Sequence, residues 1–243
     1  MFLMQRKFVR NDKSDCDQQN NDNEVIHKVR FFLTHFFVLF IKNILRKSDV
    51  VYIFITISLK DKLKMNIQTD KIILLVGLMG SGKTSVGRRL AQRLNLPFVD
   101  GDQEVEKAAG LSLVDVLKCF GPEEYRAGEA RVMKRLLQGA PCVLASGGGS
   151  FVCDQTRKLA RERAVTIWLK ADVDVLCTRT AGRQRRPFLQ GDDAELREKI
   201  ENYVSEEYPY YSEADIVVET KEERVSDTVN RVLMSLESFL KQI

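Results

Sequence analysis

Cysteine is scarce in this 243-residue chain. The five cysteines are odd in number and no two of them form a C-x-x-C pair; they are Cys16, Cys119, Cys142, Cys153 and Cys177. An odd set without paired spacing argues against a disulfide framework and against a zinc site. The cysteine pattern therefore suits a reducing compartment, and we expect a cytoplasmic protein.

Long apolar runs are also missing. The two longest candidates are residues 31–41 and 50–59, and each falls short of the roughly 20 residues that a helix needs to span a bilayer. Neither run has the placement and the small-residue ending of a signal peptide. We therefore expect no stable membrane span, although a peripheral anchor at the membrane surface remains an alternative.

Most of the chain lacks an excess of positive charge. Residues 1–64 hold 12 Lys and Arg against 7 Asp and Glu, which leaves 26 against 27, a net charge of −1, for residues 65–243. The basic character of the whole chain therefore belongs to its first 64 residues. The remainder has no electrostatic footprint for nucleic acid, so we expect no nucleic-acid partner.

The first 64 residues differ from the rest in composition. Residues 1–30 are polar, with Asn, Asp and Gln clustered at 11–23, a composition typical of disorder. Met65 then opens the segment MNIQTDKIILLVG, which leads directly into an apolar run. We expect residues 1–64 to be an N-terminal extension, either disordered or a gene-model artefact, and residues 65–243 to form the functional domain.

A phosphate-binding loop organises that domain. The apolar run 72–76 is followed by Gly77-Leu78-Met79-Gly80-Ser81-Gly82-Lys83-Thr84 and then by apolar residues at helical spacing, namely Val86, Leu90, Ala91 and Leu94. The motif G-x-x-x-x-G-K-[ST] thus lies between a strand and a helix, which is the context that identifies it.

The residue types of this loop suit a nucleotide. Gly80 and Gly82 can turn successive backbone N–H groups toward a phosphate, and the helix N-terminus adds positive charge. The Lys83 ammonium can reach the β and γ phosphates, and the Thr84 hydroxyl can ligate Mg²⁺. The predicted cofactor-binding residues of the loop are Gly80, Ser81, Gly82, Lys83, Thr84 and Ser85.

Two acids follow the next apolar segment. Residues 96–102 read as a short strand that ends in Asp100 and Asp102. In a parallel α/β sheet, ligands bind beyond the carboxyl ends of the strands, so both acids are expected near the phosphate loop. Asp102 could accept a hydrogen bond from a substrate hydroxyl, and Asp100 could serve a metal ion through water.

Further along, a helix from about residue 120 to about residue 138 is predicted from Pro122 and the acids after it. Arg126 and Glu129 lie three residues apart on one face of this helix and can pair. The segment 141–146 reads as a strand that ends in Gly147-Gly148-Gly149. Three glycines in that place allow another group to approach the backbone closely.

The rest of the domain alternates strands with helices. We expect strands at 164–169 and 214–218 and helices at 173–182, 193–207 and 226–240, a pattern that predicts a parallel sheet with helices on both faces. Between two of these helices, four arginines lie within eight residues, at 179, 183, 185 and 186. We predict a lid at about 182–194, which would bring the charge of this basic stretch to a transferring phosphoryl group.

Residues 70–220 resemble the bacterial-type shikimate kinases. The matching landmarks are GLMGSGKTSVGRRLA at 77–91, DGD at 100–102, FGPEEYRAGE at 120–129, SGGG at 146–149, RTAGRQRRPFL at 179–189 and YPYYSEADIVV at 208–218. The set is far more specific than the phosphate loop alone. The resemblance implies a doubly wound α/β fold with a five-stranded parallel sheet. It also implies transfer of the γ-phosphoryl group of ATP, with Mg²⁺, to the 3-hydroxyl of shikimate.

The resemblance also implies roles for particular residues. It places Asp102 at the substrate hydroxyls, Arg126 at the shikimate carboxylate, and the backbone of Gly148 and Gly149 against the substrate. It makes Arg186 the lid arginine that reaches the phosphates and puts Arg179 near the adenine. Lys83, Asp102 and Arg186 are the expected catalytic residues, and Thr84, with Asp100 through water, is the expected metal site. A monomer is expected.

One position departs from the family's pattern. The family usually has an arginine two residues before the proline of its Y-P-x-Y segment, where it contacts the substrate carboxylate, and this chain has Glu207. If Glu207 faces the site, shikimate binding should be weakened. If it points to solvent, Lys221, Arg224 or a lid arginine could replace the missing cation.

Two other functions stay open on the sequence. One is a kinase of a different small polyol, such as gluconate, on the same fold. The other is a weakly active nucleotide-binding module held at a membrane by residues 1–64.

Overall fold

The structure is a computed structural model of the chain, and it describes residues 67, 69–181 and 192–242. All of these residues belong to the second of the two units into which the chain divides, Met65–Ile243. The predicted N-terminal extension, residues 1–64, lies outside the described residues. So does most of the predicted lid, of which only residues 192–194 are described.

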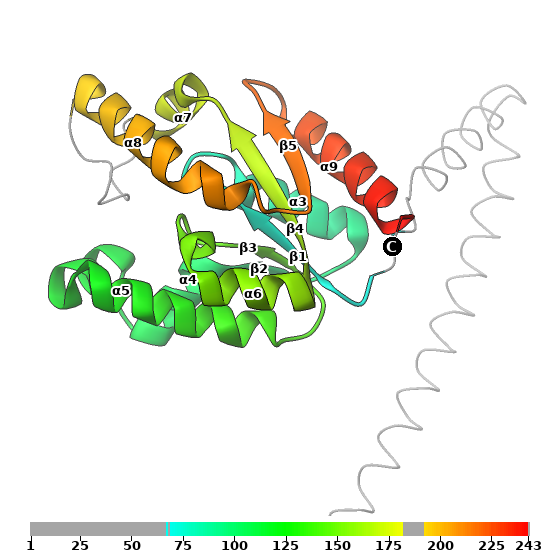
Figure 1. Ribbon diagram of the computed structural model, residues 1–243, viewed down its shortest axis with the longest axis horizontal. Coiled ribbons are helices and arrows are strands. Elements are labelled where there is room, and N and C mark those ends of the chain that lie inside the picture. Colours follow the sequence, from blue (N-terminus) through cyan, green and yellow to red (C-terminus); the bar gives the residue numbers. More distant parts are fainter. Residues whose placement is uncertain (1–66, 68, 182–191, 243) are drawn as a thin grey trace, which may run out of the picture. The chain divides into compact units, whose positions relative to one another are not determined.

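The described part of the chain alternates strands with helices, as predicted (Figure 1). In chain order the elements are β1 Ile72–Val76, α3 Lys83–Leu94, β2 Phe98–Asp100, α4 Gly101–Ala109, α5 Leu113–Leu137, β3 Val143–Ala145, the 3₁₀ turn η1 Ser150–Val152, α6 Asp154–Arg163, β4 Ala164–Ala171, α7 Val173–Thr180, α8 Asp193–Tyr211, β5 Ile216–Thr220 and α9 Val225–Leu240.

The five strands form one sheet in the order β2-β3-β1-β4-β5, and every neighbouring pair is parallel. Strand β1 is central: Leu74 lies opposite Leu144 of β3 and opposite Thr166 of β4. All five residues of β1 are buried, which is why the strand reads as an unbroken apolar run. The five-stranded, doubly wound fold is therefore confirmed.

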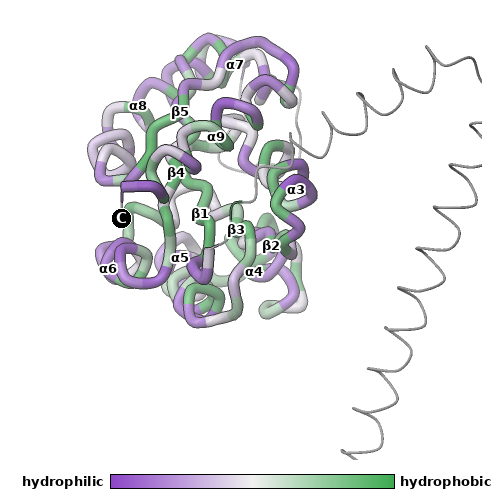
Figure 2. Tube along the Cα trace, turned by 90° about the vertical axis from the view of Figure 1, so that its right-hand side faces the viewer, coloured by the Kyte–Doolittle hydropathy of each residue, from purple (hydrophilic) through white to green (hydrophobic). Residues whose placement is uncertain are grey.

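Helices cover both faces of the sheet, and alternate residues of β1 enter two separate cores. Ile73 and Leu75 pack with Leu90 of α3 and Val232 of α9. The other residues of β1 pack on the opposite face with side chains of α5, α6, α7 and α8, among them Met133, Ala160, Leu176, Leu196 and Tyr211. Figure 2 shows the apolar strands enclosed by helices that carry polar stretches. The two cores hold the carboxyl ends of β1, β2 and β3 beside one another, where the site is built.

Helix α8 is longer than predicted. The sequence interpretation ended it at residue 207, before Pro209, and this was wrong, because the helix continues to Tyr211. Pro209 lacks one helical hydrogen-bond donor, but the last turn packs its aromatic rings on β4. The centroid of the Trp168 ring lies 4.9 Å from that of Tyr208 and 6.0 Å from that of Tyr211. This packing offsets the lost hydrogen bond.

The segment after α3 also differs from its prediction. Residues 96–102 were expected as one short strand, whereas β2 covers Phe98–Asp100 and α4 begins at Gly101. Asp102 therefore lies in the first turn of a helix rather than at a strand end. A Cβ at Gly101 would lie 3.1 Å from the carbonyl oxygen of Ala145, so a glycine lets α4 start directly against β3. Of the described helices, none combines the length and the apolar character that a bilayer crossing needs.

Candidate active site

The loop between β1 and α3 has the backbone of a phosphate-binding loop. Gly80 and Gly82 have φ angles of 89° and 100°, which confirms the prediction that both use conformations unfavourable to other residues. Gly82 is the N-cap of α3, and the helix starts at Lys83. The positive end of the helix therefore points into the loop.

Lys83 lies at the mouth of this loop. Its Nζ donates hydrogen bonds to the carbonyl oxygens of Gly77, at 2.6 Å, and of Leu78, at 3.1 Å. The residue is buried, so a mobile side chain is held in one place. The ammonium group is thereby preorganised to face an anion bound in the loop.

Thr84 and Asp100 come together as the sequence predicted. The Thr84 hydroxyl donates to Asp100 Oδ2 over 2.9 Å, although the two residues belong to α3 and β2. Hydroxyl and carboxylate oxygens are the hard ligands that Mg²⁺ prefers. In the part of the chain that is described, no cluster of three or more His, Cys, Asp or Glu side chains could hold a metal ion. A cation at Thr84 and Asp100 could take its other ligands from water and phosphate.

A cavity of about 590 Å³ extends from the phosphate loop in both directions. On the side of α4 and α5 it is lined by Asp102, Tyr125 and Gly148, and on the side of β5 by Arg179 and Thr220. The predicted residues Asp102, Gly148 and Arg179 thus share one cavity with the loop residues Gly80–Ser85. Tyr125 was not predicted, because an aromatic residue at helical spacing reads as an ordinary core residue.

Arg126 lies against the glycine segment after β3. Its Nη1 donates to the carbonyl oxygen of Gly148 and to Glu129 Oε2, each at 3.2 Å. A Cβ on Gly149 would lie only 2.3 Å from the same nitrogen. The pairing of Arg126 with Glu129 and the close approach to the glycines are both confirmed. The guanidinium side chain remains 44% exposed, so it can receive an anion from the solvent side.

Glu129 lies on the buried side of Arg126. Its Oε1 accepts a hydrogen bond of 2.7 Å from the hydroxyl of Ser150. Burial raises the pKa of the Glu129 carboxyl, while the hydrogen bond from Ser150 and the charge of Arg126 act in the opposite direction. Arg126 is therefore oriented by a buried acid on its own helix and by the backbone of the glycine segment.

Glu207 points into the protein. It is 6% exposed, so the alternative in which this side chain faces solvent is wrong. The Tyr211 hydroxyl donates to Glu207 Oε2 over 2.7 Å and accepts from the backbone N–H of Gly149 over 3.2 Å. The charges of Arg126 and Lys83 both act on the Glu207 carboxylate. Tyr211 was missed by the sequence interpretation, although its i+4 spacing from Glu207 was a usable signal.

Arg179 borders the other end of the cavity. Its Nη1 lies 3.4 Å from both the Ser81 carbonyl oxygen and the Thr220 hydroxyl. Glu223 and Thr228, which were not predicted, line the cavity beside them. The Thr228 hydroxyl donates to Glu223 Oε1 over 2.7 Å, and hydrogen bonds led by that from Arg231 lower the pKa of Glu223 to about 2. The predicted lid residue Arg186 lies outside the described residues.

Comparison with known proteins gives one consistent family. The family model described as shikimate kinase matches residues 79–237. The shikimate kinase of Paramagnetospirillum magneticum is 47% identical over 171 residues, which cover 70% of this chain and 86% of that protein. The shikimate kinase of Rhodopseudomonas palustris is 41% identical, with 70% of this chain and 83% of that protein covered.

Solved structures agree with this result. The shikimate kinase of Acinetobacter baumannii in complex with shikimate superposes with a TM-score of 0.68 at 30% identity, over 72% of this chain and 97% of that one. The shikimate kinase of Aquifex aeolicus has a TM-score of 0.59 at 34% identity, over 68% of this chain and 95% of that one. With the fold, the cavity and the family model in agreement, this chain belongs to the shikimate kinase family.

Proposed function

We propose that this chain transfers the γ-phosphoryl group of ATP to the 3-hydroxyl of shikimate and that the cavity described above is the site of transfer. Shikimate kinases use ATP with Mg²⁺. The observation that supports the assignment to this cavity is its lining. One continuous cavity joins the phosphate loop to Asp102 and Gly148 on one side and to Arg179 on the other. A nucleotide and a small hydroxylated acid can therefore meet at Lys83.

At the nucleotide end, the chain supplies charge and position. Lys83, held on two carbonyl oxygens, faces the β and γ phosphates. The backbone N–H groups of the loop at Gly80–Gly82 bind the phosphate oxygens, and Arg179 lies at the adenine. Phosphoryl transfer depends mainly on alignment and on neutralising the charge of the transferring group, so these contacts account for most of the expected catalysis.

Thr84 and Asp100 fit the metal that this reaction uses. When bound, Mg²⁺ supplies positive charge at the β and γ phosphates. Thr84 would ligate the ion directly, and Asp100, 2.9 Å from the Thr84 hydroxyl, would hold it through water. Asp100 also orients that hydroxyl, because it accepts its hydrogen bond.

At the acceptor end, Asp102 and Arg126 divide the recognition. Asp102 accepts a hydrogen bond from the substrate hydroxyl and can take its proton as the new P–O bond forms. Arg126, oriented by Glu129 and Gly148, binds the substrate carboxylate, for which a planar guanidinium is well suited. The backbone of Gly148 and Gly149 lies against the substrate ring.

The proposal also covers the lid, the oligomeric state and the location of the protein. Arg186 of the lid segment is the residue that we assign to the transferring phosphoryl group, by its place in the family's lid motif. We further propose that the protein works as a monomer in the cytoplasm. A kinase of another polyol and a weakly active nucleotide-binding module are not favoured, because relatives at 38–47% identity are named shikimate kinase.

The test compares acceptors and one variant. The purified chain should form ADP when given Mg²⁺-ATP and shikimate, and far less when gluconate replaces shikimate. Lys83→Ala should lower kcat by at least about 10² because a preorganised charge at the transferring group is lost. Lys71→Ala, which changes a lysine before β1, is the matched control and should keep its rate. Equal turnover of shikimate and gluconate, or a Lys83→Ala enzyme with more than a tenth of the parent rate, would contradict the assignment.

A further inference from the structure

The hydrogen bonds of Glu207 connect it with the backbone segment on which Arg126 rests. Tyr211 is fully buried and bridges the two, since its hydroxyl donates to Glu207 Oε2 and accepts from the N–H of Gly149. Arg126 lies against Gly149 and donates to the carbonyl oxygen of Gly148. Three hydrogen bonds, through Tyr211 and the Gly148–Gly149 backbone, thus connect Glu207 with the residue proposed to hold the substrate carboxylate.

The proposed acceptor site already contains several acidic side chains, which disfavour the binding of an anionic substrate. Glu129 and Glu207 are both buried, and the charge of Asp102 acts on Glu129. The cations that act on Glu207 are Arg126 and Lys83. A substrate carboxylate at Arg126 adds a further negative charge close to these buried acids. When negative charges are brought together in this way, ionisation becomes less favourable. The carboxyl group whose anion is least stabilised then takes up a proton most readily.

From the described residues, the Glu207 anion receives fewer hydrogen bonds than the Glu129 anion does. Glu129 accepts from the Ser150 hydroxyl and from the cationic Arg126. Among the described residues, the hydrogen-bond donor to the Glu207 side chain is the neutral phenol of Tyr211. Burial raises the pKa of Glu207, against the hydrogen bond from Tyr211 and the charges of Arg126 and Lys83.

The titratable neighbours of Glu207 on its own helix do not stabilise its anion. The other titratable groups that face it from α8 are Tyr203 and Glu206. Tyr203 is neutral at physiological pH, because burial raises its pKa. Glu206 is exposed to solvent, and its negative charge raises the pKa of Glu207 further.

We propose that Glu207 takes up one proton from solvent when the substrate carboxylate binds beside Arg126, so that this enzyme binds shikimate as the Glu207 acid. The proposal rests on the proposed function, which places that carboxylate at Arg126. The carbonyl oxygen of the protonated Glu207 carboxyl can still accept the hydrogen bond from the Tyr211 hydroxyl. Shikimate affinity then falls as the pH rises, by at most tenfold per pH unit for one linked proton.

Calorimetric titration of shikimate into the full chain tests this directly. The titrations are made in pairs of buffers with different ionisation enthalpies, between about pH 6 and about pH 8.5, where a substrate carboxylate stays ionised. The parent chain should take up a proton in part of this range, and its affinity should fall on the alkaline side. Glu207→Gln keeps an acceptor for Tyr211 and should bind with no proton uptake and with little dependence on pH.

Two further variants keep the result interpretable. Glu206→Gln changes the neighbouring exposed acid and should keep most of the parent's proton uptake. Tyr211→Phe removes the hydrogen bond that favours the Glu207 anion, so its proton uptake should extend to higher pH. The proposal is overturned if the parent binds shikimate without proton uptake, or if Glu207→Gln keeps the parent's uptake. Absence of shikimate binding in every chain would instead overturn the proposed function, and this inference with it.

Discussion

At the scale of single residues, Glu207 shows how the fold accommodates a buried carboxylate. A buried carboxylate is costly unless it is hydrogen-bonded or neutralised. Here Tyr211 supplies the hydrogen bond, and Arg126 and Lys83 supply distant positive charge. Because the pKa of Glu207 is raised in the folded state, its contribution to stability is greatest below its unfolded pKa. That contribution is lost as the pH rises through the folded pKa.

Replacing Glu207 by arginine should strengthen shikimate binding. The side chain at this position is buried and lies within reach of the charge of Arg126, so Glu207→Arg exchanges an anion for a second cation near the substrate carboxylate. We expect a gain of about 1–3 kcal/mol, the range for a charge-assisted hydrogen bond. Calorimetric titration of shikimate measures it, and ATP affinity should hardly change. Glu206→Arg, one residue away and exposed, is the control. Equal shikimate affinity in all three chains would show that position 207 does not act on the carboxylate.

At the scale of elements, helix α5 carries the acceptor end of the site, and it is broken at Gly121. This residue has φ 80° and ψ 172°, a non-helical conformation, and Pro122 follows it. The sequence interpretation expected a helix to open near residue 120, and the second part of α5 corresponds to it. After the break, Tyr125 lines the cavity, and Arg126 lies against the glycine segment. Both parts of α5 pack on α4, since Val116 and Val132 share a cluster with Val105.

Two glycines of α5 should respond in opposite ways to alanine. Gly121→Ala should destabilise the fold by about 1–3 kcal/mol, because its backbone conformation suits glycine alone. A Cβ there meets no atom within 4 Å, so the effect belongs to the backbone. Gly128→Ala should stabilise the fold by about 0.5–1 kcal/mol, since Gly128 is helical and alanine is the better helix former. Chemical denaturation of both variants measures the difference, and a stabilising Gly121→Ala would contradict the kink.

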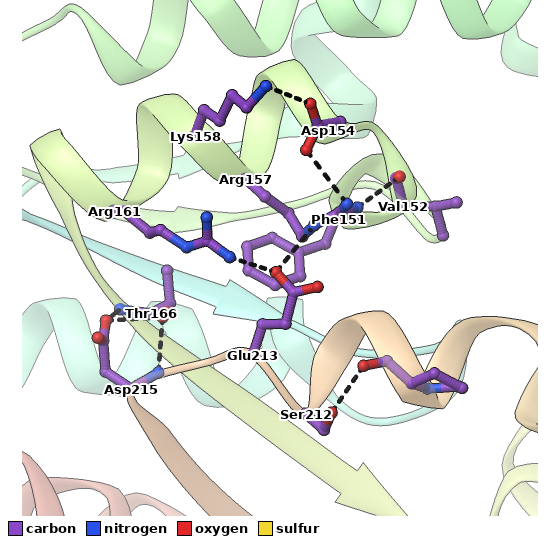
Figure 3. Close-up of polar contacts among 11 residues, drawn as sticks. Phe151, Val152, Asp154, Arg157, Lys158, Arg161, Thr166, Ser212, Glu213 and Asp215 are labelled. Atoms are coloured by element: carbon purple, nitrogen blue, oxygen red, sulfur yellow. Dashed lines mark hydrogen bonds and ion pairs between the residues drawn. The ribbon is translucent and has the colours of Figure 1, made fainter.

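A second set of contacts between elements joins η1 to the segment that follows α8. Figure 3 shows Arg157 of α6 reaching toward the carbonyl oxygens of Phe151 and Val152, at 3.0 and 2.6 Å, and toward Glu213, at 3.1 Å. Arg157 is almost fully buried. Because η1 directly follows Gly149, these contacts help to hold the glycine segment in place from behind the site.

Arg157 should therefore matter far more than the arginine beside it. Arg157→Met should cost about 1–3 kcal/mol of unfolding free energy, since it leaves the carbonyl oxygens of Phe151 and Val152 without their charged donor. Arg161 binds the same Glu213 oxygen at 2.6 Å but is 58% exposed, so Arg161→Met should cost no more than about 1 kcal/mol. Thermal and denaturant unfolding of the two variants, side by side, measures this contrast. Similar losses would show that the Arg157 cluster is no better than a surface ion pair.

At the scale of the whole molecule, everything assigned to function lies in the unit Met65–Ile243. The family model matches residues 79–237, inside that unit. The sheet, both cores and the cavity are made from residues of this unit as well. Every described contact on which the proposed chemistry depends thus comes from this unit.

A chain that begins at Met65 should fold and keep the activity of the full chain. The physical reason is that all described members of both cores lie after Met65. Its thermal unfolding and its kcat and KM for shikimate should match those of the full chain. Insolubility of the shortened chain, or loss of its turnover, would show that residues 1–64 belong to the working protein.

Much of this molecule could be predicted from local rules. The phosphate loop follows from glycine spacing between a strand and a helix, and Gly80 and Gly82 have the positive φ angles that this requires. The pairing of Arg126 with Glu129 follows from an i, i+3 spacing on one helix. The parallel sheet follows from alternating elements. Each of these predictions used only patterns among residues near one another in the chain, so the sequence by itself determined them.

Contacts between distant segments decided the rest. Whether Glu207 faced solvent or the site depended on how α8 packs on β4, and on Tyr211 meeting Gly149, 62 residues away. The same packing carries α8 past Pro209. The meeting of Thr84 with Asp100 was expected from the sheet edge, but its hydrogen bond required the placement of α3 beside β2. Residue types and spacings specify local geometry. The partner of a buried charge depends on the long-range packing that only the tertiary structure contains.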